Sequence, residues 1–299
     1  MEFVTLGITC HNAHDTISRA ISSALNQEYE NFEVLVVDDC STDGSWKILC
    51  EIAKLEPRLK ILRHDVNRGY AASLNTIVTN ASGLYIAIFD DDDCSVPARI
   101  SLQMDRVTTY ERRTGCSLVF CYSNRAVIKD GENSVDHIAY AIGRIAPEPS
   151  GAEVVDYLLG LGGRHGKCWG NFGSCTMLAR KTTFEAVGPF DVVFRRCAEW
   201  DMAIRGGYIG AAFIAVDQPL ITQYKTSSPD KSGNISLKYA LLLRVKHKSY
   251  FKSPHVYWAS RMFAYARFYG NGGLKFKSRV CFYIGLLMAP HLAIKFLRV

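Results

Sequence analysis

Short apolar runs rich in β-branched residues alternate with amphipathic stretches through about the first 125 residues. This alternation predicts βα units, in which parallel strands form a sheet and helices cover its faces. With 299 residues, 48% of them hydrophobic, the chain can bury a sizeable core, which excludes a disordered tail. The runs predicted to be strands are 3–9, 33–38, 59–63, 84–89 and 117–122.

After residue 122 the strand signals become less regular. Asp130 and Gly131 lie between two alternating segments and predict a hairpin. The segment 199–207 is predicted to be helical and to precede a strand at 211–216. We therefore expect the second half of the domain to depart from simple βα alternation.

Charge divides the chain into two parts. Residues 225–299 contain 14 Lys and Arg against one acid, Asp230, whereas residues 1–224 carry a net charge of −7 within the total of +6. The two parts are expected to face different partners. Because the sequence has neither an internal repeat nor a low-complexity linker, we expect one α/β domain over 1–224 and a basic helical extension over 225–299.

The ten cysteines are expected to be reduced thiols. No pair has Cys-x-x-Cys spacing, and Met1 leads into the first apolar run without a signal peptide, so we expect a cytoplasmic protein. No two of the eight histidines have zinc-ligand spacing with a cysteine pair, and we expect no structural zinc.

Four consecutive aspartates, at 90–93, follow the apolar run 84–89 at the expected carboxyl end of a buried strand. Adjacent carboxylates repel one another, and burial raises their pKa values unless a positive charge lies among them. Mg²⁺ or Mn²⁺ is the natural partner, because these ions take oxygen ligands and leave positions open for phosphate oxygens. A solvated acidic turn, with Asp93 capping the next helix, explains the isolated run equally well.

Two further polar clusters favour a ligand site. Asp38 and Asp39 end the run 33–38, and the polar segment 9–12 ends the first run. The carboxyl ends of parallel strands lie at one edge of a sheet, where α/β proteins bind ligands. We therefore expect the three clusters to converge on one ligand.

These segments resemble the glycosyltransferases of family 2, and the ordered set is far more specific than any one motif. The resemblance covers roughly residues 3–216. It implies a single Rossmann-like domain of the inverting, A-type nucleotide-sugar glycosyltransferase fold, with a mixed central sheet. The segments that carry the resemblance are 4–12, 21–27, 36–44, 67–69, 74–75, 90–93 with Pro97, Gly188-Pro189-Phe190-Asp191, and Glu199-Trp200-Asp201 with Arg205.

The resemblance implies that residues 1–125 form a nucleotide-sugar-binding half and residues 126–224 an acceptor-side half. The donor would be a nucleotide sugar, with a UDP-sugar favoured, and the cofactor Mn²⁺ or Mg²⁺. Asp92 is the implied metal ligand. Leu74 stands where many relatives have arginine, and Arg68 is the candidate to supply that charge instead. The implied donor-binding residues are Thr9, His11, Asp39, Arg68, Asp90 and Asp91.

Glu199 matches the position of the family's aspartate base, reckoned from Arg205, and would take a proton from an acceptor hydroxyl. Where the family usually has two adjacent acids, this chain has Ala198 and Glu199, and another acid, Asp201, follows two residues after Glu199. Residues so spaced on a helix cannot both point into one cleft, so we favour Glu199. Acids at a helix N-terminus also occur without catalysis, because the helix dipole favours them. The acceptor-side candidates are Trp169, Asn171, Trp200 and Asp201, with Phe172 as a further aromatic.

The implied activity is metal-dependent, inverting transfer of a sugar to a hydroxyl of a saccharide or lipid-linked saccharide in bacterial surface polysaccharide synthesis. Two alternatives stay open. An acidic pair followed by a strand that ends at Asp90 also resembles a Mg²⁺-binding receiver-like signalling module. A nucleotidyltransferase on a similar fold would release pyrophosphate instead of a nucleoside diphosphate.

The basic tail is aromatic-rich, and its longest uncharged stretch, 280–294, contains Pro290. Its 15 residues would span about 22 Å as a helix, less than a hydrocarbon core of about 30 Å. The flanking cations suit a segment lying in the headgroup region of an anionic membrane, and we favour peripheral contact with its cytoplasmic face. The alternative is a helical layer packed on the catalytic domain. The cations are Lys275, Lys277, Arg279, Lys295 and Arg298.

Nucleic-acid binding is the remaining interpretation of this tail. Basic grooves with stacking aromatics bind single strands. The acidic balance of residues 1–224 argues against it, and we expect no nucleic-acid partner.

Overall fold

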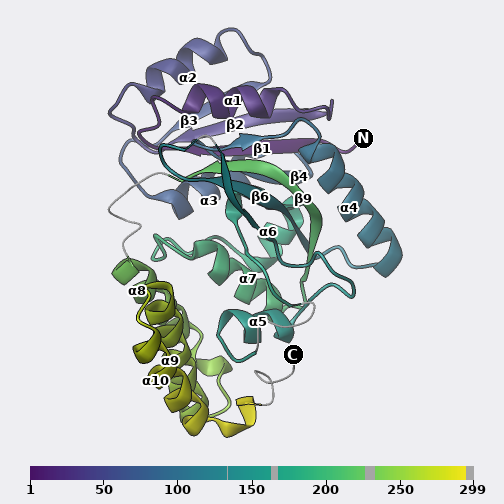
Figure 1. The fold of residues 1–299 in the computed structure, drawn as a ribbon. Helices are drawn as coiled ribbons and strands as arrows, with labels where there is room; N and C mark the ends of the chain where they lie inside the picture. The colour runs from purple at the N-terminus through teal and green to yellow at the C-terminus, as the bar shows by residue number, and fades with distance from the viewer. Residues whose placement is uncertain (133, 163–167, 226–232, 294–299) are drawn as a thin grey trace.

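The computed structural model describes residues 1–132, 134–162, 168–225 and 233–293, whose fold is shown in Figure 1. The strands are β1 (Val4–Cys10), β2 (Phe32–Asp38), β3 (Leu59–Arg63), β4 (Tyr85–Asp90), β5 (Cys94–Ser95), β6 (Val119–Ile128), β7 (Val135–Ala139), β8 (Leu178–Arg180) and β9 (Ala212–Tyr224). The helices are α1 (Ile17–Leu25), α2 (Ser45–Ala53), α3 (Tyr70–Asn80), α4 (Arg99–Thr114), α5 (Ala152–Leu158), α6 (Lys181–Val187), α7 (Ala198–Tyr208), α8 (Gly233–Lys246), α9 (Pro254–Asn271) and α10 (Lys275–Met288).

One mixed sheet joins the strands of the described residues in the order β3-β2-β1-β4-β8-β6-β9-β5, with β7 beside β6. The first four strands of the chain are parallel neighbours, which confirms the predicted βα alternation. Strands β8 and β6 are antiparallel to their neighbours β4 and β8. The sheet is therefore mixed, as the family resemblance implies.

Alternation along the strands divides the core between the two faces of the sheet. In β2, Val34 and Val36 pack into one hydrophobic cluster, and Leu35 and Val37 pack into the other. Successive side chains of a strand point to opposite faces, so a run of continuous apolar residues is buried on both. Helices α1, α2 and α4 cover the first face, and α3, α5, α6 and α7 cover the second (Figure 1).

The second half contains the predicted hairpin, formed by β6 and β7 around Asp130 and Gly131. The predicted helix at 199–207 is α7, and the strand predicted at 211–216 is the first half of β9. That strand continues to Tyr224, because its pairing with β6 resumes after a register shift. A receiver domain has an all-parallel sheet in the order 2-1-3-4-5, so this topology excludes the receiver-like alternative.

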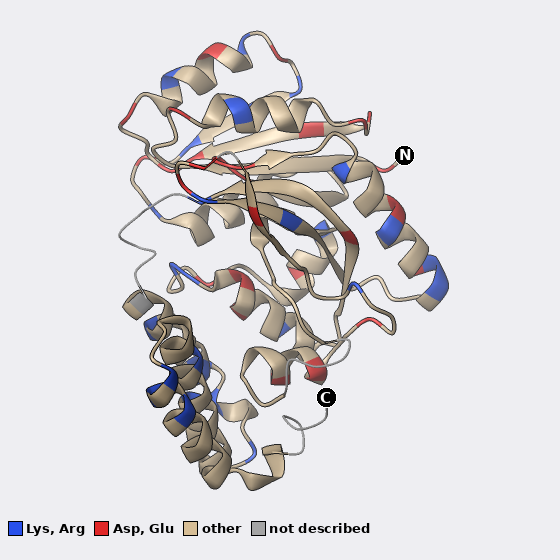
Figure 2. Cartoon of the chain, viewed as in Figure 1, with Lys and Arg blue, Asp and Glu red and all other residues tan. Residues whose placement is uncertain are grey.

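Helices α8, α9 and α10 form a layer beside α7 and α5 (Figure 1). Arg244 of α8 is buried there, donating to the carbonyls of Ser260 in α9 and Leu159 after α5, at 2.9 and 3.1 Å. Lys and Arg recur along these helices, and residues 233–293 contain no acid (Figure 2). Ile294, Lys295 and Arg298 lie outside the described residues.

None of the described helices combines the length and the hydropathy that crossing a bilayer requires.

Candidate active site

The three polar clusters meet at one edge of the sheet. In the parallel register, Thr9 of β1 pairs with Val37 of β2 and with Asp90 of β4, and Cys10 pairs with Asp38. The strands therefore end level with one another, and the residues that follow them lie together, as predicted from the sequence.

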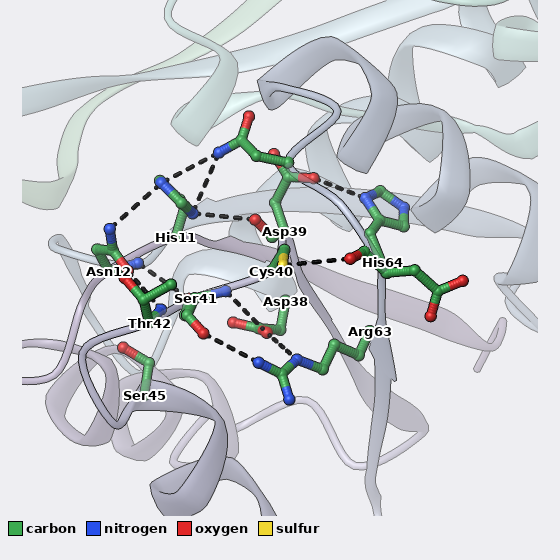
Figure 3. A network of polar contacts seen from close by, with 12 residues as sticks. His11, Asn12, Asp38, Asp39, Cys40, Ser41, Thr42, Ser45, Arg63 and His64 are labelled. Carbon is green, nitrogen blue, oxygen red and sulfur yellow. Dashed lines mark hydrogen bonds and ion pairs between the residues drawn. The ribbon is translucent and has the colours of Figure 1, made fainter.

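Asp39 is the centre of the network drawn in Figure 3. Its Oδ1 accepts from the backbone N–H of Arg68 at 2.8 Å, and its Oδ2 from that of Gly69 at 2.7 Å. His64 Nδ1 lies 2.7 Å from Oδ1, and His64 Nε2 lies 2.9 Å from Thr76 Oγ1. Gly69 has a φ of 87°, which favours glycine, and directly precedes α3. Asp39 thus holds the start of α3 against the end of β2.

His11 connects this network to the acidic run. Its backbone N–H donates to Asp91 Oδ2 at 2.9 Å, and its Nδ1 lies 3.0 Å from the Asp39 carbonyl oxygen. The His11 side chain is exposed at the edge, whereas Thr9 is buried within β1. The Arg68 side chain is exposed too, and it lines a hollow over α3. The structure therefore brings His11, Asp39 and Asp91 into contact, with Thr9 beneath them.

Burial gives the acidic run unusual protonation behaviour. Burial raises the pKa of Asp90 to about 6, with a further contribution from the charge of Asp92. Burial also raises the pKa of Asp93 to about 8, and the charges of Asp90 and Asp92 contribute to that rise. Burial also raises the pKa of Asp91 to about 7, against the hydrogen bond from His11. Asp93 is buried and the other three aspartates are half-buried, so the run is not the fully solvated turn of the alternative.

Asp93 does not cap the next helix. It is buried, and its Oδ1 accepts from the backbone N–H of Tyr224 at 3.2 Å, which ties the acidic run to the end of β9. Its Oδ2 is buried and has no hydrogen-bond partner among the described residues. Ligand atoms of Asp90, Asp93 and Cys175 lie within 4.8 Å of one another. Asp92, the implied ligand, is not a member of this cluster, although its charge acts on both aspartates.

The donor set fits a hard divalent cation. Carboxylate oxygens are the ligands that Mg²⁺ and Mn²⁺ prefer, and a cation would offset the burial and the mutual repulsion that raise these pKa values. The Cys175 sulfur is a softer donor than these hard cations prefer, so the two carboxylates are the expected ligands of this cluster. Tyr70 completes the surroundings, since its hydroxyl lies 3.0 Å from Asp90 Oδ1 and 2.8 Å from Ser174 Oγ.

Arg125 of β6 is a site residue that the sequence did not reveal. Its charge lowers the pKa values of Asp90, Glu199 and Cys175 against the effect of burial. Its Nη1 lies 3.9 Å from Cys175 Sγ, and its buried Nε has no hydrogen-bond partner in the described chain. A Cβ on Gly173 would fall 1.7 Å from Nη1, so the glycine makes room for the guanidinium.

Glu199 lies in the first turn of α7, half-buried in the same electrostatic environment. Burial raises its pKa, Arg196 and Arg125 oppose that rise, and the charge of Asp90 adds to it. The influence of Asp90 and Arg125 indicates that Glu199 lies within electrostatic range of the acidic edge. A carboxylate with a raised pKa suits a general base, because its basicity then approaches that required near neutral pH.

Asp201 is not positioned to contact an acceptor. Its side chain is fully buried, and its oxygens lie 2.8 Å from Arg205 Nε, 2.7 Å from Lys246 Nζ and 3.0 Å from His247 Nε2. Burial alone would raise its pKa, but the hydrogen bonds from His247 and Lys246 and the charge of Arg205 lower it to about 2. Asp201 instead joins α7 to α8.

The aromatic candidates have different surroundings. Phe172 is a core residue, only 2% exposed, so it cannot stack on a sugar. Trp169 is half-buried beneath the Arg144 guanidinium, 4.4 Å from its ring centroid. The exposed Asn171 donates to the Tyr140 carbonyl from its backbone N–H and from Nδ2. Trp200 is half-buried, with Arg267 of α9 at 5.7 Å from the ring. Trp169 and Asn171 thus belong to one surface, and Trp200 faces the helical extension.

Two other polar residues hold the loop before α7. Asn75 of α3 forms a reciprocal pair with the backbone of Phe190, at 2.9 and 2.7 Å. Arg205 donates to the carbonyls of Val187 and Pro189 at 2.6 and 2.8 Å. Asn75, the segment 188–191 and Arg205, which carry part of the family resemblance, therefore hold the loop before α7 in place.

Polar strand ends at one edge of the sheet are typical of a ligand-binding α/β domain, and the chain belongs to glycosyltransferase family 2. The sequence model of Glycosyl transferase family 2 matches residues 5–181. The similarity to particular proteins is lower and more local.

A UDP-Glc:alpha-D-GlcNAc-diphosphoundecaprenol beta-1,3-glucosyltransferase from Escherichia coli, WfaP, is 35% identical over 130 residues, or 44% of this chain and 49% of that protein. The succinoglycan biosynthesis protein ExoU of Rhizobium meliloti is 30% identical over 70% of this chain and 58% of its own length. The matched part of the chain thus spans about half the length of these curated relatives.

Two solved structures share the fold. S. aureus TarS residues 1–349 superpose with a TM-score of 0.59 at 14% identity, over 99% of this chain and 83% of TarS. The mannosyltransferase PcManGT from Pyrobaculum calidifontis, in complex with GDP-Man and Mn²⁺, gives 0.58 at 15% identity, over 97% of this chain and 79% of its own. At these identities the likeness shows the A-type glycosyltransferase fold alone.

Proposed function

We propose that the protein is a metal-dependent, inverting glycosyltransferase. It moves a sugar from a nucleotide-sugar donor, with a UDP-sugar favoured, to a hydroxyl of a saccharide or lipid-linked saccharide. The observation that carries this proposal is the contact of the Asp39 network with the acidic run, through His11, at one edge of the sheet. The effect of the Asp90 and Arg125 charges on the pKa of Glu199 supports a base near that edge.

The names of similar proteins support the choice of substrates. WfaP is named for UDP-Glc and a diphosphoundecaprenol-linked acceptor, and TarS has been solved with UDP and with UDP-GlcNAc. ExoU and ExoO of Rhizobium meliloti are named for succinoglycan biosynthesis. We therefore place this chain in bacterial surface polysaccharide synthesis, at the cytoplasmic face of the membrane. Residues 1–224 are its proposed catalytic domain and 225–299 an extension.

Each side chain has a proposed part in the reaction. The donor nucleotide is proposed to bind against His11 and Asp39, together with Thr9 and Arg68. Its ribose and phosphates would lie next to Asp90 and Asp91. Asp92 is the proposed direct metal ligand, with the Asp90 and Asp93 carboxylates beside it. The divalent cation would neutralise the negative charge of the departing nucleoside diphosphate. Trp169, Asn171 and Trp200 are the proposed acceptor-side residues.

Glu199 supplies the base. Its carboxylate takes the proton of the acceptor hydroxyl as that oxygen attacks the anomeric carbon from the side opposite the leaving group. A single displacement of this kind inverts the anomeric configuration. The charge of Arg125 lowers the pKa values of Glu199 and Asp90 against the effect of burial, and its guanidinium would stabilise the negative charge that develops beside them.

Replacing Asp92 with alanine is expected to abolish metal-dependent donor hydrolysis and sugar transfer, because the proposed cation loses its direct ligand. Mn²⁺ should no longer raise the melting temperature of this variant in the presence of UDP. Asp105→Ala, on the exposed face of α4, is the matched control and should behave like the wild type. Metal-dependent transfer by Asp92→Ala at the native rate would contradict the ligand assignment.

Replacing Arg125 with glutamine is expected to lower kcat about 10²-fold, because one preorganised cation is lost from the site. The pH at which half of Glu199 is ionised should rise too, since Arg125 lowers the pKa of Glu199. A pH–rate profile checks both effects. A variant with native kcat and an unshifted profile would exclude Arg125 from the reaction.

The product distinguishes glycosyl transfer from the nucleotidyltransferase alternative. With a UDP-sugar donor and an acceptor mixture, glycosyl transfer releases UDP. A nucleotidyltransferase supplied with UTP and a sugar 1-phosphate would instead join them into a UDP-sugar and release pyrophosphate. Chromatography of the nucleotides formed should show UDP in proportion to the sugar transferred. Pyrophosphate as the product would overturn the proposal.

A further inference from the structure

Helix α10 carries an apolar face that no other described part of the chain covers. Phe276, Tyr283 and Leu287 are 81%, 62% and 80% exposed, and Val280 and Ile284 are also exposed. Their spacing of three, four and seven residues places them on one side of the helix. Isolated apolar residues are common on protein surfaces, but a continuous stripe of five indicates an interaction site.

The opposite side of α10 is packed tightly on α9, so the exposed stripe has a fixed direction. Gly285 is buried, and a Cβ there would lie 2.5 Å from the Phe263 ring. The rings of Phe282 and Phe263 are 5.6 Å apart, and Ser278 Oγ donates to the Ala266 carbonyl at 2.8 Å. Packing against α9 therefore turns the stripe outward.

Cations flank the stripe on both sides. At about 100° per residue, the stripe is centred on the direction of Phe276 and Leu287. Lys275 and Arg279 then project on one side of it, and Lys277 on the other, and all three are exposed. No acid occurs anywhere in residues 233–293 to offset them (Figure 2). An apolar centre between two cationic margins is the pattern of a helix that lies in a membrane interface.

We propose that α10 docks on the surface of an anionic bilayer, with its apolar stripe (Phe276, Val280, Tyr283, Ile284 and Leu287) among the acyl chains and its cations at the headgroups. Anionic lipids offer both a negative charge and an apolar layer. A second copy of the chain packed about a two-fold axis would oppose Lys275, Lys277 and Arg279 to the same cations. A nucleic acid would offer phosphates but no apolar layer for the stripe.

The docked surface is connected to the catalytic helix. Helix α8, in the same layer as α10, is ion-paired to Asp201 of α7 through Lys246, and Arg267 of α9 lies over Trp200 of α7. Helix α7 carries Glu199, so docking would hold the proposed base at a fixed height above the bilayer. This arrangement suits the lipid-linked acceptor proposed above. Membrane binding itself needs no substrate and is tested independently of the reaction.

Sedimentation with vesicles tests the surface. The wild type should bind vesicles that contain phosphatidylglycerol, bind phosphatidylcholine vesicles weakly, and lose affinity as salt is raised. Replacing Phe276, Tyr283 and Leu287 with serine should weaken binding at least about tenfold, because three apolar side chains no longer enter the bilayer. The matched control, Leu55→Ser with Val135→Ser and Ile145→Ser, changes three other exposed apolar residues and should bind like the wild type.

A second variant distinguishes loss of membrane contact from misfolding. Replacing Lys275, Lys277 and Arg279 with glutamine leaves the apolar packing intact and should remove the preference for anionic vesicles. Equal binding by the wild type and the serine variant would overturn the proposal. So would salt-sensitive binding to RNA without binding to vesicles, or a dimer in solution that only the serine substitutions dissociate.

Discussion

Replacing Glu199 with glutamine is expected to lower the rate of sugar transfer about 10²- to 10⁴-fold while donor binding is kept, because the amide cannot take the acceptor proton. The wild-type rate should rise with pH through a pKa above the ordinary range of glutamate, since burial raises that pKa. The variant should lose this dependence. Single-turnover transfer and UDP titration measure the two properties separately.

The matched control is Glu153→Gln, which removes an exposed acid from the first turn of another helix, α5. If the acid at 199 served only to complement the helix dipole, both variants would lose a few tenths of a kcal/mol of stability and neither would lose activity. Transfer at the native rate by Glu199→Gln would show that another group is the base.

Replacing Asp201 with asparagine is expected to destabilise the fold by about 3–5 kcal/mol, because Arg205, Lys246 and His247 would lose their shared buried counter-charge. The folded-state pKa of Asp201, about 2, is below its unfolded value, so its contribution is present above about pH 4 and is lost as pH falls toward 2. The difference between wild type and variant should therefore shrink over that range. Urea unfolding at several pH values measures it.

Asp191→Asn provides the comparison. Asp191 also pairs with Lys246, at 2.8 Å, but in a more exposed position. Its loss should cost about 1 kcal/mol or less, since solvent screens exposed ion pairs. If the two variants are equally stable, Asp201 does not hold α7 to α8.

The meeting of the three strand-end clusters could be predicted from the sequence, because neighbouring parallel strands end at the same edge of the sheet. To predict that the runs ending near residues 9, 38 and 90 place their polar residues together, it was enough to know that parallel strands share a carboxyl edge. The same rule, applied to the third run, would have found His64, which follows β3 and contacts Asp39. That signal was in the sequence and was missed.

Arg125 could not have been found in this way. It lies within β6, after a register shift against β9 between Ser123 and Arg125, so its direction depends on a bulge that no sequence pattern marks. Its place beside Cys175 also depends on Gly173, more than 40 residues away in the chain. The role of Asp201 was hidden likewise, because Lys246 and His247 come from the helical extension.

The structure supports the packed helical layer, and membrane contact by the extension stays a prediction. Helices α8 and α9 are packed on the domain, as the helical-layer alternative requires, while α10 keeps an apolar face exposed. Composition could not separate these outcomes, because the face a helix buries depends on the partner that covers it.

Calorimetric titration of UDP with and without Mn²⁺ tests most directly whether the acidic run at 90–93 binds a cation that in turn binds a diphosphate. We expect UDP to bind the wild type with Mn²⁺, to bind far more weakly with a chelator, and to show no metal effect with Asp92→Ala. Equal UDP affinity with Mn²⁺ and with the chelator would contradict the account.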